Sequence, residues 1–330
     1  MRAIVQHRYG PPADVLELRD DVDKPHVTDA GVLVRVHASS VNSGDWRRVT
    51  ARPFLVRLFE GLRRPRTPLV GSDAAGVVEA VGKDATHVTV GDEVYGMRSG
   101  AFAEYVSGQS FVSKPQNLSF EQAAAVPAAG CTALQALRDR GNVQPGQKVL
   151  VYGAGGGVGT FAVQIAKAFG AEVTAVTSTD NLDLARSIGA DHVIDYRRED
   201  FSRSGQRYDL IVDASGRPPV GAFRRALPPA GTLVLVAAGA GAFGAVGRFV
   251  GSQLRRRVLK QRVVVFIASG PFNENLLTLK QLIEAGKITP VIDRTYPLSE
   301  TADAIRYAET ERVRGKVVIT VQGDPAPVGS

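Results

Sequence analysis

The stretch that decides the fold runs from Gln147 to Ser178 and reads QKVLVYGAGGGVGTFAVQIAKAFGAEVTAVTS. Its first apolar run, 149–152, predicts a buried strand, and the segment after the glycine cluster has apolar residues at helical spacing. A second β-rich run follows at 173–177. A strand, a tight turn, a helix and a second strand form the unit in which a chain presents a glycine turn and a helix N-terminus to a dinucleotide.

The glycine turn departs from the strict GxGxxG motif. Its six residues, 154–159, begin with alanine where the first glycine is expected. Without side chains at positions 156 and 157 the backbone can approach a pyrophosphate, and the first N–H groups of the helix supply unpaired donors. The alternative is a tight turn that binds nothing. The flanking strand and helix favour binding, and the predicted cofactor contacts are Gly155, Gly156, Gly157, Val158 and Gly159.

The composition indicates a globular protein of two domains. A chain of 330 residues with 44% hydrophobic and 22% charged residues is long enough to form more than one core. A single cysteine excludes an intramolecular disulfide and a multi-cysteine metal site. The longest uncharged stretch, 226–247, contains prolines and glycines that favour a strand and loop over a membrane span. Because the N-terminus lacks the apolar core of a signal peptide, we expect a cytoplasmic protein.

The order of predicted elements divides the chain near residue 124. Residues 1–124 are β-rich, with short runs separated by glycine and proline turns. Ser119–Gln122 has the form of a capping box that begins a short helix, and Pro127 ends this helix. From Lys148 onward strands and helices alternate, which predicts a doubly wound parallel sheet. Its six predicted strands are 149–152, 173–177, 192–195, 209–214, 232–237 and 263–268.

Two arginine-rich segments interrupt this pattern. Segment 47–67 holds seven arginines among phenylalanines and leucines. Three interpretations remain open for it: a lid, a contact with a membrane surface, or a helix with a solvated charged face, the last being the default expectation. Segment 248–262 is also basic, but it lacks an aromatic stacking platform, so we do not expect nucleic-acid binding.

Motifs spread over nearly the whole chain share their order and spacing with one family. They are VNSGD (41–45), GSDAAGVV (71–78), VG (81–82), VGDEV (90–94), PAAGCT (127–132), AGGGVG (154–159), GAD (189–191), DY (195–196) and RGKV (314–317). On these motifs the chain resembles the medium-chain dehydrogenase/reductase superfamily, in its zinc-free quinone-oxidoreductase-like branch. The resemblance implies a GroES-like β-barrel catalytic domain over 1–124, completed by 269–330. It further implies a six-stranded Rossmann domain over 125–268, a cleft between domains for cofactor and substrate, and a homodimer.

The zinc ligands of related alcohol dehydrogenases are missing. Zinc enzymes of the superfamily place a cysteine near the position of Asn42 and a His-Glu pair at 72–73, and this chain has neither. Cys131 lies past the position of the second cysteine ligand, so we expect it to be a small buried residue beside the cofactor. The five histidines are scattered without ligand spacing. We therefore expect no metal.

The resemblance also assigns catalytic residues. Asn42 and Asp45 match an Asn-x-x-Asp pair that lines the cleft, where Asn42 would orient the nicotinamide ribose or donate to the substrate oxygen. The alternative for Asn42 is a turn residue that satisfies its own backbone. Some relatives carry a tyrosine acid at the position of Arg47, so here Arg47 or solvent would supply the proton. Asp73 is either a structural or a chemical carboxylate, and Thr132 matches a nicotinamide contact.

Cofactor choice depends on the end of the second strand, where NAD enzymes carry an acidic residue. This chain has neutral hydroxyls there that would bind a 2′-phosphate, and relatives use the tyrosine that matches Tyr196 for the same end. Asp180 would repel a phosphate unless it caps the next helix or unless the arginines at 197–198 compensate. The prediction is NADPH, with NADH less favoured, and the contacts are Thr177, Ser178, Thr179 and Tyr196.

Three functions fit these observations. The favoured one is hydride transfer from NADPH to quinones or α,β-unsaturated carbonyls, which delocalise negative charge without a metal. The second is a zinc-independent oxidoreductase that acts on aldehydes and ketones. The third is a non-catalytic NADPH-binding protein with RNA affinity, which the basic segments would motivate.

Overall fold

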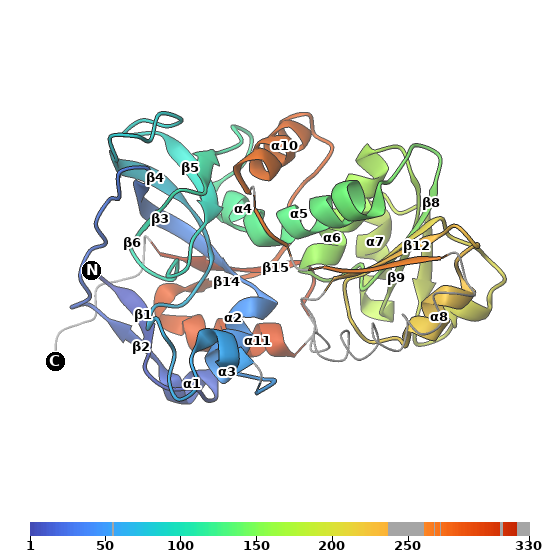
Figure 1. Ribbon diagram of the computed structural model, residues 1–330, viewed down its shortest axis with the longest axis horizontal. Helices are drawn as coiled ribbons and strands as arrows, with labels where there is room; N and C mark the ends of the chain where they lie inside the picture. Colours follow the sequence, from blue (N-terminus) through green and yellow to red (C-terminus); the bar gives the residue numbers. More distant parts are fainter. Residues whose placement is uncertain (55, 237–260, 267, 271, 311–312, 322–330) are drawn as a thin grey trace. The chain divides into compact units, whose positions relative to one another are not determined.

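The computed structural model describes residues 1–330 except 55, 237–260, 267, 271, 311–312 and 322–330 (Figure 1). The chain folds into two compact units. The first unit comprises Met1–Ala128, Gly270–Glu284 and Pro290–Ser330, and the second comprises Ala129–Ser269 and Ala285–Thr289. The short segment Ala285–Thr289 belongs to the second unit, where two hydrogen bonds of 3.0 and 2.8 Å join Thr289 to the side chain of Gln164.

The second unit confirms the predicted doubly wound fold. Within the described residues its sheet has six parallel strands in the order β10-β9-β8-β11-β12-β13. The order reverses between β8 and β11, the point at which open α/β sheets bind their ligands. The strands are β8 (Lys148–Tyr152), β9 (Glu172–Thr177), β10 (His192–Asp195), β11 (Leu210–Asp213), β12 (Thr232–Val236) and β13 (Arg262–Phe266).

Helices lie between these strands and pack on the sheet (Figure 1). In the helix that follows the glycine turn, every residue from Gly159 to Ala166 is buried. Residues 153–156 form the tight turn between the end of β8 and this helix, which begins at Gly157, so the strand, turn and helix follow one another as predicted. The elements are α5 (Pro127–Leu134) with a π-helical continuation at Gln135–Gly141, α6 (Gly157–Ala168), a 3₁₀ turn at Thr179–Asn181, α7 (Leu182–Ser187), a 3₁₀ turn at Phe201–Arg203, and α8 (Val220–Arg225).

The first unit is built on a mostly antiparallel sheet that the C-terminal stretch completes, as the GroES-like prediction requires. Within the described residues its seven strands run β14-β15-β3-β4-β5-β7, and β6 pairs with β3. The two strands of the C-terminal stretch pair with each other in parallel. A separate hairpin-like pair joins β1 (Ala3–Gln6) to β2 (Leu16–Arg19). The main strands are β3 (Val32–Val41), β4 (Asp73–Val81), β5 (Glu93–Met97), β6 (Tyr105–Gly108), β7 (Phe111–Ser113), β14 (Ile292–Pro297) and β15 (Lys316–Thr320).

Helices of the first unit surround this sheet. The predicted capping box is present, since the Ser119 hydroxyl accepts from the Gln122 N–H and the Gln122 side chain accepts from the Ser119 N–H. The next helix begins with Pro127, a residue suited to the first helical turn. The helices are α1 (Pro12–Val15), α2 (Ser43–Thr50), α3 (Val56–Glu60), α4 (Phe120–Ala124), α10 (Phe272–Glu284) and α11 (Thr301–Glu309), with a 3₁₀ turn at Leu298–Glu300.

Segment 47–67 is helical only in part, and its exposed charged side chains agree with the default expectation of a solvated charged face. Rather than one continuous helix, the segment contains the end of α2 and the separate short helix α3, and no residue of α3 is buried. Residues 248–260 of the second basic segment lie outside the described residues, as do residues 237–247 of the uncharged stretch 226–247. Among the described residues, no helix is long and apolar enough to cross a membrane.

Candidate functional site

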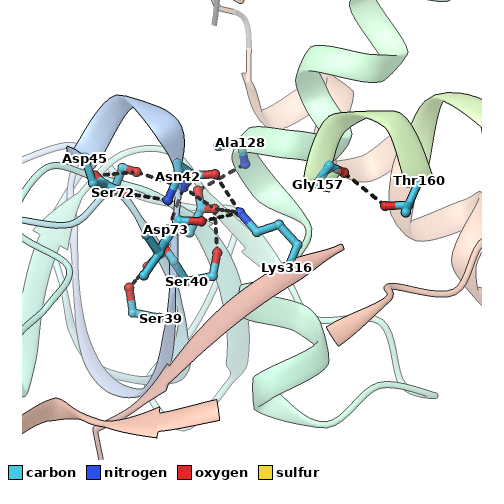
Figure 2. A network of polar contacts seen from close by, with 11 residues as sticks. Ser39, Ser40, Asn42, Asp45, Ser72, Asp73, Ala128, Gly157, Thr160 and Lys316 are labelled. Carbon is cyan, nitrogen blue, oxygen red and sulfur yellow. Dashed lines mark hydrogen bonds and ion pairs between the residues drawn. The ribbon is translucent and has the colours of Figure 1, made fainter. Parts of the chain in front are cut away.

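A group of charged side chains is buried in the first unit, where a charge is costly unless it is paired. Asp73 is 0% exposed, and Asp45 and Lys316 are each 3% exposed. The Lys316 Nζ atom lies 3.6 Å from Asp73 Oδ2 and donates a 2.6 Å hydrogen bond to Asn42 Oδ1 (Figure 2). It also donates to the main-chain oxygen of Val41 at 3.1 Å. We call four side chains the charged cluster: Asn42, Asp45, Asp73 and Lys316.

Three neighbouring strands bring the charged cluster together. β4 begins at Asp73 and pairs with β3 so that Ser40 lies opposite Asp73. β15 begins at Lys316 and pairs with the same end of β3, which Asn42 follows. Because strand ends that share a register meet at one edge of a sheet, residues from distant parts of the chain become direct neighbours.

The side-chain amide of Asn42 is fully engaged within the cluster. Its Nδ2 donates to Asp73 Oδ2 at 2.9 Å and to Ser72 Oγ at 3.2 Å, with the Ser40 carbonyl oxygen 3.5 Å away. Its Oδ1 accepts from Lys316. An amide has two N–H donors, so these contacts use both and fix which way the amide faces. In this arrangement Asn42 has no spare donor for a substrate oxygen.

Asp73 is the acceptor at the centre of the cluster. Its Oδ2 accepts from the Ser40 hydroxyl at 2.9 Å, and its Oδ1 accepts from the main-chain N–H of Ala128 at 3.0 Å, in the first turn of α5. Burial raises the pKa of Asp73, and the positive charge of Lys316 acts in the opposite direction. Burial likewise lowers the pKa of Lys316, against the attraction of the two carboxylates.

Asp45 is joined to the cluster through a serine. Its Oδ2 accepts from the main-chain N–H of Asn42 at 2.8 Å, and its Oδ1 lies 3.3 Å from the Ser72 hydroxyl. Burial raises the pKa of Asp45 to about 6, and the nearby negative charge of Asp73 adds to the effect. A carboxyl group with this pKa exchanges its proton near neutral pH, as a general acid or base must.

Arg47 stands apart from the charged cluster. It lies half-buried on α2, and its Nε is buried without a hydrogen-bond partner among the described residues. No described carboxylate lies within ion-pair distance of its guanidinium. Burial lowers the pKa of Arg47. The result is a positive charge that the described protein groups leave uncompensated.

Sequence reasoning missed the one cation of the charged cluster, Lys316. Lys316 was noted only within the RGKV motif, and Ser40 and Ser72 were given no role. The available signal was a lysine at the first position of an otherwise apolar strand, KVVIT, whose residues 316–319 are all buried. A lysine in that setting needs an acceptor, and the acceptor is not visible in sequence.

In the second unit the glycine turn has the geometry of a phosphate-binding turn. A Cβ atom at Gly159 would lie 2.1 Å from the Gly153 carbonyl oxygen, so close helix–strand packing requires glycine there. At Gly156 the nearest atom to such a Cβ is 3.6 Å away, and φ is −87°. Packing therefore does not explain glycine at 156, the N-cap of the twelve-residue helix α6. An open N-terminus of this kind suits an anion.

The ends of β9 and β10 lie side by side, with Asp195 opposite Thr177. The Thr179 hydroxyl donates its hydrogen bond to the Asp195 carboxylate at 2.5 Å, so in this arrangement it cannot donate to a cofactor phosphate. Asp180 does not cap the next helix, because its Oδ2 pairs with Arg197 Nη1 at 3.2 Å. The arginine thus compensates the carboxylate that would otherwise repel a phosphate.

The other predicted cofactor contacts have mixed surroundings. Tyr196 is 37% exposed and stacks on Tyr152, with ring centroids 6.2 Å apart. Thr177 is 2% exposed, Ser178 is half-buried, and Thr132 is 9% exposed on α5. Cys131 is fully buried. Among the described residues, no group of three or more His, Cys, Asp or Glu side chains lies close enough to hold a metal ion.

Two protein families match successive parts of the chain. Residues 28–166 match the alcohol dehydrogenase GroES-like domain, and residues 188–319 match the zinc-binding dehydrogenase family.

Individual proteins resemble the chain over nearly its whole length. It is 34% identical to a 2-methylene-furan-3-one reductase of Solanum lycopersicum, over 97% of this chain and 79% of that protein. It is also 34% identical to an NADPH-dependent alkenal/one oxidoreductase of Arabidopsis thaliana, over the same shares of both chains. The solved quinone oxidoreductase of Coxiella burnetii superposes with a TM-score of 0.86 at 31% identity, covering 98% of this chain and 99% of that one.

Proposed function

The chain belongs to the medium-chain dehydrogenase/reductase superfamily, in its quinone-oxidoreductase-like branch, and is an NAD(P)H-dependent oxidoreductase; we propose that it reduces quinones and α,β-unsaturated carbonyls with NADPH and without zinc. Reduction of such an acceptor adds a hydride and a proton. Conjugation spreads the developing negative charge over several atoms, so these acceptors need no Lewis acid.

One observation carries the zinc-free part of the proposal: an ammonium occupies the cluster. The positions where zinc relatives hold their ligands carry Asn42, Ser72 and Asp73 here, and the Lys316 Nζ lies among them. Zinc sites are built from thiolates, imidazoles and carboxylates. One carboxylate, an amide and a hydroxyl around a fixed positive charge do not fit a Zn²⁺ ion, because the ammonium would repel it.

When bound, NADPH supplies the hydride, and the chain's own groups manage charge and protons. We assign the proton to Asp45. In its protonated form Asp45 donates to the half-buried Ser72 hydroxyl, 3.3 Å away, and Ser72 passes its own proton to the reduced acceptor. Asn42 holds Ser72 in place from the other side through its 3.2 Å contact, rather than touching the substrate oxygen itself.

Arg47 is assigned an electrostatic role. A guanidinium keeps its proton at neutral pH, so Arg47 is a poor proton donor. Its charge has no described carboxylate partner, and half-burial limits how far water screens that charge. We assign it to the developing negative charge on the acceptor oxygen.

Cofactor preference follows from the ends of β9 and β10. The turn at 155–159 would hold the pyrophosphate, with Gly156 giving the closest approach of the backbone. The Asp180 carboxylate is neutralised by Arg197, and Arg197 remains half-exposed, with 53% of its side chain accessible. The 2′-phosphate of NADPH would bind to this guanidinium, whereas NADH has no 2′-phosphate and would not depend on Arg197. This supports NADPH over NADH.

The test is a fluorescence titration with NADPH and NADH, followed by a turnover assay on protein dialysed against a chelator. We expect tighter NADPH binding and turnover of a quinone and an enone that chelation does not change. Loss of turnover on chelation would contradict the zinc-free assignment, and binding of neither nucleotide would contradict the whole proposal.

The same assay separates the second candidate. Turnover of saturated aldehydes and ketones, with little on quinones and enones, would indicate a carbonyl or alcohol oxidoreductase. Cytoplasmic location and homodimer formation stay predictions of the proposed enzyme, and the third candidate, a non-catalytic protein with RNA affinity, requires nucleotide binding without any turnover.

A further inference from the structure

The short helix α3 and its flanks expose large apolar side chains. Eight large hydrophobic side chains are exposed among the described residues, and four of them lie within nine consecutive positions. Their exposed fractions are 64%, 52%, 72% and 61%, for Phe54, Leu58, Phe59 and Leu62 respectively. Single exposed apolar residues are ordinary, but a group of this kind marks an interaction surface.

This apolar surface is held in place by polar contacts. The Arg48 guanidinium pairs with Glu60 at 3.0 Å, and the Tyr9 hydroxyl donates to the Gly61 carbonyl oxygen at 2.8 Å. The Arg57 guanidinium lies 5.0 Å from the Tyr9 ring centre. A helix of five residues is not stable by itself, so these contacts fix α3 on the first unit. With α3 held in this way, the four apolar side chains remain exposed.

The same segment has a net positive charge almost equal to that of the whole chain. Residues 47–66 contain seven arginines and one glutamate, a net charge of +6, while the whole chain has a net charge of +7. Four of these arginines are exposed, and no described carboxylate lies within ion-pair distance of them. They are Arg52, Arg63, Arg64 and Arg66.

We propose that the surface formed by Phe54, Leu58, Phe59 and Leu62, together with these four arginines, docks the protein on an anionic lipid membrane. Apolar side chains enter the boundary between headgroups and acyl chains, and arginines bind the lipid phosphates. Each arginine near an anionic bilayer adds to binding, so the apolar and charged parts act together.

Other occupants fit the surface less well. A symmetric contact with a second copy would bring two segments of charge +6 against each other, and like charges oppose such an interface. Nucleic-acid bases stack on aromatic rings, but half of the exposed apolar side chains are leucines. A lipid surface uses both the leucines and the phenylalanines.

The test is co-sedimentation of the full chain with phosphatidylcholine vesicles, with and without phosphatidylglycerol. We expect binding only to the anionic vesicles, and partial retention at high salt because apolar insertion is not screened. Phe54→Ser/Phe59→Ser and Arg63→Glu/Arg64→Glu should each weaken binding about tenfold or more. The matched controls, Val90→Ser/Leu277→Ser and Arg203→Glu/Arg207→Glu, change exposed residues elsewhere and should bind as the parent does.

Several outcomes would overturn the proposal. One is the absence of sedimentation with either vesicle, and another is binding that the segment variants leave unchanged. A third is concentration-dependent dimerisation that the segment variants abolish, which would assign the surface to a second copy. A fourth is that the parent protein does not bind vesicles but shifts RNA in a gel, and that the segment variants abolish this shift. NADPH titration of every variant checks its fold, and membrane docking is independent of the proposed reductase activity.

Discussion

The Lys316 Nζ donates a 2.6 Å hydrogen bond to Asn42 Oδ1, although 274 residues separate the two in the sequence. The same ammonium lies 3.6 Å from Asp73 Oδ2, and all three polar groups meet where β3, β4 and β15 align their ends. Lys316 therefore determines the orientation of the Asn42 amide, and through it the position of Ser72.

Replacement of Lys316 by methionine should destabilise the first unit. The change leaves the Asp73 carboxylate buried beside no positive charge, which we expect to cost about 3 kcal/mol or more. Chemical unfolding followed by circular dichroism measures the loss. Lys316→Met/Asp73→Asn removes both charges and should recover part of it, so equal stability of the parent and Lys316→Met would contradict the ion pair.

Asp45 should make stability fall as pH rises through weakly acidic values. Its pKa is about 6 in the folded protein against 3.8 ordinarily, so the folded state binds more protons between these values. The free energy of unfolding then decreases across this window by up to about 3 kcal/mol. Unfolding of the parent and Asp45→Asn at both ends of the window isolates this contribution. If both respond identically to pH, Asp45 does not titrate there.

The turnover rate should decline as pH rises above about 6, because the protonated fraction of Asp45 falls about tenfold per pH unit there. Asp45→Asn should lower kcat and remove this dependence, and Ser72→Ala should lower kcat without greatly changing nucleotide affinity. Steady-state kinetics over a pH series measures all three proteins. Asp14→Asn changes a surface carboxylate and serves as the control. An unchanged profile in Asp45→Asn would assign the proton to another group.

Gly156→Ala should fold normally and bind NADPH poorly. The added methyl group meets no atom closer than 3.6 Å and φ is −87°, so the backbone accepts it. It would, however, occupy the space that a pyrophosphate needs, and we expect affinity to fall about tenfold or more. Gly221→Ala also adds a methyl group in open space on α8 and should bind as the parent does. Normal binding by Gly156→Ala would remove the turn from the cofactor site.

Arg197→Gln should weaken NADPH binding about tenfold and leave NADH binding nearly unchanged, because only the former carries a 2′-phosphate. Asp180→Asn releases Arg197 from its ion pair and should strengthen NADPH binding. Arg203→Gln alters a comparable exposed pair with Asp200 and provides the control. Parallel fluorescence titrations with both nucleotides give the ratios. An equal loss for NADPH and NADH in Arg197→Gln would indicate a general effect on the turn.

The sequence by itself determined the fold of the second unit. Apolar runs of strand length, an amphipathic helix at 157–168 and the glycine turn are local patterns, and the parallel sheet follows from their alternation. Strand β14 was missed because its outward positions are polar and its pattern is weak. The predicted roles of Arg47, Thr132 and Tyr196 stay predictions.

Only the tertiary structure decided how the charged groups are partnered. The family resemblance predicted Asn42 and Asp45 as catalytic, but the lysine that holds the Asn42 amide comes from the last strand along the chain. The sequence left open whether Asp180 caps the next helix or is compensated by the arginines at 197–198, and the structure pairs it with Arg197. The sequence also did not show that Phe54 and Phe59 are exposed, because an apolar residue in an amphipathic segment is expected to be buried. Each depends on contacts between distant parts of the chain, which periodicity and motifs do not encode.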